Sequence, residues 1–151
     1  KPEGADEYFD EIGADDAVKH AFAELPGNPP LHRSYNKHTK TFFCVKTCTT
    51  GREVSFVPVG QALEFVAMKS NQHSFKLLRN GKPLAEQAVS VVSSDGHKQA
   101  LVTDHHGVVK IKPSDAGPMM LLSVWITMPE HADGVYHSDY ATLTVDLARG
   151  H

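Results

Sequence analysis

Long apolar runs are missing from this sequence, and positive charge is sparse. In the 151 residues, no apolar stretch approaches the roughly 20 residues that a helix needs to cross a bilayer. The 15 Lys and Arg residues against 18 Asp and Glu residues give a formal net charge of -3. No basic stripe interleaves with aromatic residues, as nucleic-acid-binding surfaces usually require. We therefore expect no membrane span in this chain and no nucleic-acid partner.

Motifs that usually identify an enzyme are missing as well. The sequence contains no GxSxG nucleophile elbow, no HExxH zinc motif and no recognisable setting for a catalytic cysteine. We expect a protein that is not an enzyme. The opening residues, "KPEGADEYFDEIG", lack the apolar core of a signal peptide. We expect a mature product whose targeting segment has been removed.

Cysteine is scarce, and its two residues lie close together. Cys44 and Cys48 occur in "FFCVKTCTTG". In a straight strand, residues four apart are separated by about 13 Å, whereas a disulfide needs Cα atoms within about 7 Å. The neighbouring Thr49-Thr50-Gly51 favours a turn, so we expect a Cys44–Cys48 disulfide in an oxidising compartment. A thiolate metal site is the alternative interpretation of the same spacing.

Histidine, in contrast, is abundant, with 10 residues. Imidazole is the commonest protein ligand of transition metals. His105 and His106 are adjacent in "TDHHGVVKI", where Asp104 is expected to form a turn and Gly107 to supply a positive φ. Adjacent residues of an extended chain point in opposite directions. The two imidazoles therefore share one metal only where the turn bends them together.

Further ligands are expected from a second loop, "PEHADGVYHSDY", because loops at one end of a β-sandwich gather in space. Glu130, Asp133 and Asp139 of this loop are candidate oxygen ligands, and His38 and His73 are candidates for a second cluster. The predicted metal is nickel, cobalt, copper or zinc. The predicted metal ligands are His105, His106, His131 and His137.

The chain from "HTKTFFCV" onward shows β-strand patterns. Segments such as "AVSVV", "VVKIK" and "TLTV" alternate with period 2, and Asn80-Gly81 and Asp95-Gly96 are turn signals. Pro58 makes "EVSFVPVG" at 53–60 an edge or irregular strand. We expect a mainly β protein: an antiparallel immunoglobulin-like or transthyretin-like β-sandwich over residues 38–151. Residues 1–37 are expected to form an extension with short helical turns.

Several motifs follow one another along the chain: "LHRSYNKHTKTFF", "VSFVPVG", "LLRNGKPLAEQAVSVVSSDG", "VTDHHGVVKIKPSDAGPMMLLSVW" and "YHSDYATLTVDL". Their order resembles a bacterial periplasmic family of unknown function that often accompanies nickel or cobalt uptake systems. The resemblance implies a periplasmic metal-binding or metal-delivery domain whose partner is a membrane transporter or another envelope protein. The alternative hypothesis is a non-catalytic interaction or structural module whose histidines are incidental.

Overall fold

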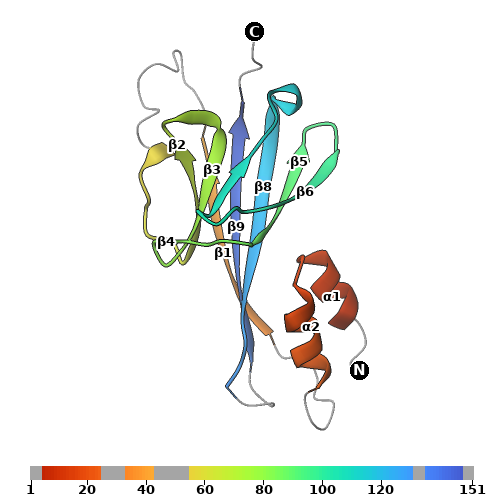
Figure 1. The fold of residues 1–151 in the computed structure, drawn as a ribbon. Coiled ribbons are helices and arrows are strands. Elements are labelled where there is room, and N and C mark those ends of the chain that lie inside the picture. The colour runs from red at the N-terminus through yellow and green to blue at the C-terminus, as the bar shows by residue number, and fades with distance from the viewer. Residues whose placement is uncertain (1–4, 25–32, 43–54, 131–134, 148–151) are drawn as a thin grey trace.

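The fold consists of two β-sheets with two short helices beside one of them (Figure 1). The computed structural model describes residues 5–24, 33–42, 55–130 and 135–147. In chain order the elements are α1 (Ala5–Glu11), α2 (Asp16–Ala23), β1 (Arg33–Thr41), β2 (Leu63–Met68), β3 (Asn71–Arg79), β4 (Lys82–Pro83), β5 (Ala88–Ser93), β6 (Lys98–Val102), β7 (Val108–Lys110), the 3-10 helix η2 (Pro113–Asp115), β8 (Pro118–Thr127) and β9 (Tyr136–Asp146).

The larger sheet has the strand order β1-β9-β8-β5-β6. Strands β9, β8, β5 and β6 pair antiparallel, whereas β1 runs parallel to β9, from Arg33 beside Tyr136 to Thr41 beside Thr144. Paired residues of neighbouring strands lie on the same face of a sheet. This register therefore decides which side chains of β1 and β9 meet.

The smaller sheet has the order β2-β3-β4, and β7 also pairs with β3. Asn80 and Gly81 connect β3 to β4 with φ values of 49° and 79°. Positive φ at both central residues is the signature of a type I′ hairpin turn, as the Asn-Gly pair predicts. The turn between β6 and β7 also contacts β3, because the backbone N–H of Leu77 donates to the carbonyl of Gly107 at 2.8 Å.

The main core lies between the two sheets. Val89 and Leu143 of the larger sheet and Phe65 and Leu77 of the smaller sheet are at most 1% exposed and belong to one apolar cluster. The period-2 alternation of "AVSVV" and "TLTV" provides this core, since every second side chain points inward. The predicted mainly β sandwich is confirmed.

The two helices pack on the outer face of the larger sheet. Phe9 of α1 and Phe22 of α2 contact Tyr136 of β9 with ring centroids 6.4 and 5.5 Å apart. The hydroxyl groups of Tyr8 and Ser138 lie 2.8 Å apart and add a polar contact. The helical segment thus has its own small core against the sheet. The predicted boundary between extension and sandwich, at residues 37 and 38, lies inside strand β1.

Two further expectations concern the chain outside the core. The expected strand at 53–60 is wrong for the described residues: 55–56 form a 3-10 turn and 58–61 have irregular backbone. The backbone N–H groups of Val59 and Gly60 donate to the carboxylate of Glu64 instead of to a neighbouring strand. Within the described ranges, no helix is long and apolar enough to span a membrane.

Candidate functional site

The first candidate site is the turn between β6 and β7, which carries His105 and His106. Asp104 organises this turn: its Oδ1 accepts the backbone N–H groups of His106 at 2.9 Å and Val108 at 3.0 Å. The hydrogen bond from Val108 lowers the pKa of Asp104 more than desolvation raises it, and the bond from His106 lowers it further. Asp104 is therefore the turn-forming residue that the sequence predicts.

Gly107 is required at this turn for two reasons. Its φ is +74°, a conformation that side chains with a Cβ rarely adopt. A Cβ at this position would also lie 2.9 Å from the backbone nitrogen of Leu84 and 3.1 Å from the carbonyl oxygen of Leu77. Because the turn sits directly on β3, residue 107 has no space for a side chain.

We expect Gly107→Ala to lower the free energy of unfolding by about 1–3 kcal/mol from the backbone conformation alone, with a further loss from the contact with Leu84. Gly96→Ala is a matched control, since Gly96 has φ +85° but nothing within 4 Å of its added Cβ. Urea denaturation of both variants measures the difference. Equal losses of unfolding free energy would show that a Cβ at residue 107 does not clash with Leu84 or with Leu77 of β3.

The turn brings the two imidazoles together. The ring centroids of His105 and His106 are 4.1 Å apart with 47° between the ring planes. Both residues are exposed and line a cleft of about 500 Å³ on the outer face of the smaller sheet. Ser74, Lys76 and Lys110 contribute to the same cleft. The turn thus places the two imidazole rings side by side at this cleft.

The other predicted ligands lie elsewhere. His137 is on β9, which contributes no residue to the lining of this cleft. His131 lies outside the described residues, as do Cys44 and Cys48 with their predicted disulfide. Among the residues that the structure describes, no three His, Cys, Asp or Glu side chains are placed to hold a metal ion together. Of the four predicted ligands, the cleft therefore holds only His105 and His106 within the described residues.

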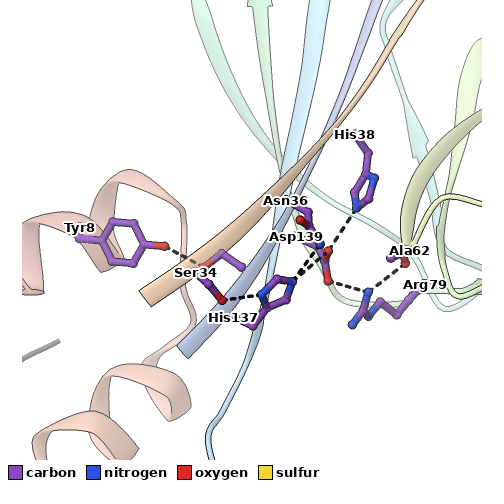
Figure 2. A network of polar contacts seen from close by, with 9 residues as sticks. Tyr8, Ser34, Asn36, His38, Ala62, Arg79, His137 and Asp139 are labelled. Atoms are coloured by element: carbon purple, nitrogen blue, oxygen red, sulfur yellow. Dashed lines mark hydrogen bonds and ion pairs between the residues drawn. The ribbon is translucent and has the colours of Figure 1, made fainter. Parts of the chain in front are cut away.

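The second candidate site is a polar network around Asp139 on the inner face of the larger sheet (Figure 2). Asp139 is 2% exposed. Its Oδ1 accepts from Nε2 of His38 at 3.1 Å, and its Oδ2 accepts from Nη1 of Arg79 at 2.9 Å. Arg79 also donates to the carbonyl of Ala62 at 3.0 Å. Nε2 of His137 also lies 3.5 Å from Oδ1, so the buried carboxylate is paired with one guanidinium and two imidazoles.

His137 belongs to this network and not to the cleft. Its Nδ1 lies 2.8 Å from the hydroxyl of Ser34, and its Nε2 lies 3.3 Å from the amide nitrogen of Asn36. The parallel register places Ser34 beside His137 and Asn36 beside Asp139, so these side chains share one face. With its carboxylate committed to His38 and Arg79, Asp139 has the arrangement of a structural ion pair between β1, β3 and β9.

A comparison with known protein families identifies the family of this chain. A family model described as "Domain of unknown function (DUF4198)" matches residues 6–127. The chain belongs to the DUF4198 family. Searches of curated proteins and of solved structures find no match to it. The matched region of this DUF4198 chain includes the helices, the His105–His106 turn and the cleft beside it, and it ends at Thr127, before β9 begins.

The polar network around Asp139 makes the stability of this DUF4198 protein depend on pH. Burial by itself raises the pKa of Asp139, but the hydrogen bond from His38 and the charges of Arg79 and His137 outweigh it, so the pKa lies below its ordinary value. The unfolded chain therefore binds more protons than the folded chain near the ordinary pKa of an aspartate, about 3.9. Stability from this group is present above that pH and is lost as the pH falls through the folded pKa.

We expect the free energy of unfolding to decrease as the pH is lowered from about 5 to about 3, and Asp139→Asn to flatten this dependence. Urea denaturation at a series of pH values measures the slope for both proteins. Asp146→Asn is the control, because Asp146 is exposed at the end of the same strand β9. Equal slopes for the parent and Asp139→Asn would contradict the expectation.

A second buried ion pair, between Lys40 and Glu64, was not predicted from the sequence of this DUF4198 chain. Glu64 is 1% exposed, and its carboxylate pairs with the ammonium of Lys40 and accepts the backbone N–H of Val59 at 2.6 Å. Lys40 also donates to the carbonyl of Phe65 at 3.1 Å. The one available signal was a glutamate inside an apolar strand segment, "ALEFVAM". Nothing in the local pattern identifies Lys40, 24 residues earlier, as its partner.

Proposed function

We propose that this DUF4198 protein is a metal-binding or metal-delivery domain that captures Ni(II), Co(II), Cu(II) or Zn(II) through His105 and His106. The observation that supports the proposal is the 4.1 Å separation of the two imidazole rings at an exposed cleft. Neutral imidazole suits all four metals. Asp104 and Gly107 fix the turn through backbone contacts, so both rings are presented without using the imidazole nitrogens to hold the turn.

Two protein ligands favour capture and release over permanent storage. Structural zinc sites enclose their metal with four protein ligands, whereas an open site keeps positions for water or for a second molecule. The described part of the chain supplies His105 and His106 and no third His, Cys, Asp or Glu placed with them. We propose that a receiving protein completes the coordination sphere during transfer.

The proposal extends to location and partner. The motif resemblance to a family that accompanies nickel or cobalt uptake supports a periplasmic protein that passes its metal to a membrane transporter or another envelope protein. The chain has no catalytic role in this proposal, because it binds its cargo and releases it unchanged. Co-purification of a tagged, full-length chain with envelope proteins tests the partner.

We expect the parent protein to bind Ni(II) and Cu(II) saturably near neutral pH, and His105→Ala/His106→Ala to weaken both affinities by at least about tenfold. Loss of supporting residues alone costs that much at other metal sites, so loss of the ligands costs no less. Binding also requires unprotonated imidazole, so the affinity falls as the pH is lowered from about 7.5 to about 5.5. Isothermal titration calorimetry measures both effects.

The matched control is His20→Ala/His97→Ala, which removes two exposed imidazoles outside the cleft. The control should bind like the parent protein. If the parent shows no saturable binding, or if His105→Ala/His106→Ala binds equally well, the proposal fails. The interaction-module hypothesis would then be favoured, supported by the edge strand β6 and its 63% exposed Val102.

A further inference from the structure

The cleft beside His105 and His106 contains two lysines. Lys76 on β3 and Lys110 on β7 both line it. Lys110 pairs with Ser74, two residues before Lys76, so the three side chains share one face of the smaller sheet. Phe75 points into the core from the opposite face, which places the lysines on the outside. Neither lysine forms an ion pair with a carboxylate of the described chain.

Two ammonium groups oppose the binding of a bare metal cation. Like charges repel, and the one carboxylate of the cleft, on Asp104, already accepts two backbone N–H groups. An ammonium group cannot ligate a metal, but it can bind an anion that does. The combination of two imidazoles and two lysines therefore fits a metal that arrives with an anionic ligand.

Ser74 provides a separate observation at the same place. The residue is 2% exposed and lines the cleft, and its hydroxyl has no hydrogen-bond partner in the described protein. Buried hydroxyl groups are nearly always paired, so the Ser74 hydroxyl is an unmet hydrogen-bonding group in the wall of the cleft, although its oxygen is covered by protein atoms. Its register neighbour Lys110 places a positive charge on the same wall of the cleft.

We propose that the cleft takes the metal as a chelate with a small tricarboxylate, with His105 and His106 on the metal and Lys76 and Lys110 on the carboxylate groups. This inference rests on the proposed metal-binding function and names its substrate class. A 1:1 chelate of a divalent metal with a tricarboxylate such as citrate reverses the sign of the cargo's charge, from a cation that the lysines repel to an anion that they attract. The cleft volume of about 500 Å³ lies in the range of small-molecule sites.

The test compares three probes on the full chain by isothermal titration calorimetry: Ni(II) alone, citrate alone, and Ni(II) with citrate at the same free Ni(II) concentration. We expect citrate to raise the affinity for Ni(II) by about tenfold, the combined effect of two partly exposed ion pairs. Citrate alone should bind at least about tenfold more weakly than the chelate, because the imidazoles contribute through the metal.

Lys76→Met/Lys110→Met should lose the gain from citrate while keeping or improving the affinity for Ni(II) alone. Lys82→Met is the control, because Lys82 is exposed on β4 of the same sheet and does not line the cleft. The inference is overturned if Ni(II) binds but citrate adds nothing, if the gain survives in the double variant, or if citrate alone binds as tightly as the chelate. Absence of Ni(II) binding to the parent overturns the proposed function instead.

Discussion

Replacing Arg79 by methionine is expected to lower the free energy of unfolding by about 3–5 kcal/mol, because the change leaves the 2% exposed carboxylate of Asp139 without its guanidinium partner. Methionine keeps much of the apolar stem of arginine, including its position near Trp125, over whose ring the guanidinium lies at 5.7 Å. The loss therefore comes mainly from an uncompensated buried charge. Urea denaturation at pH 7 measures it.

A double-mutant cycle separates this cause from lost packing. Arg79→Met/Asp139→Asn removes the charge on both sides, so we expect the double variant to be more stable than the sum of the two single losses implies. Lys98→Met, at an exposed position of the edge strand β6, is the control and should change stability by less than about 0.5 kcal/mol. Additive losses in the cycle, or a loss below about 1 kcal/mol for Arg79→Met, would contradict the ion-pair account.

Replacing Lys40 by methionine is expected to have an effect of similar size, about 3–5 kcal/mol, since it leaves Glu64 buried and without a cation. Glu64 is 1% exposed and lies in β2, where it holds the backbone of Val59 and Gly60. Lys40 also satisfies the carbonyl of Phe65, and this hydrogen bond is lost in the same variant. Thermal and urea denaturation both report the change.

The control for this variant is Lys37→Met, three residues earlier on the same strand β1, on its opposite face and exposed. Adding Glu64→Gln to Lys40→Met should recover part of the loss, because a neutral amide costs less to bury than an unpaired carboxylate. If Lys40→Met and Lys37→Met are equally stable, the buried pair contributes nothing to the fold. If Glu64→Gln fails to recover stability, the loss comes from the Phe65 hydrogen bond.

The local features of this protein were determined by the sequence itself. The Asn80-Gly81 hairpin, the turn at Asp104 with Gly107, and the cap of α2 by Asp15 depend on residues within a few positions of one another. Period-2 alternation likewise identified the core strands and the sandwich. These features are readable because glycine, asparagine and aspartate have backbone preferences that act without the rest of the chain.

The partners across the sheets were decided by the tertiary structure alone. Asp139 meets Arg79 from 60 residues earlier, and Lys40 meets Glu64 across 24 residues. His137 was assigned to a metal cluster, and it lies instead beside Ser34 because β1 pairs parallel with β9. The sequence gives the charge and size of each side chain. Its spatial neighbours depend on strand order and register, which result from the packing of the whole chain.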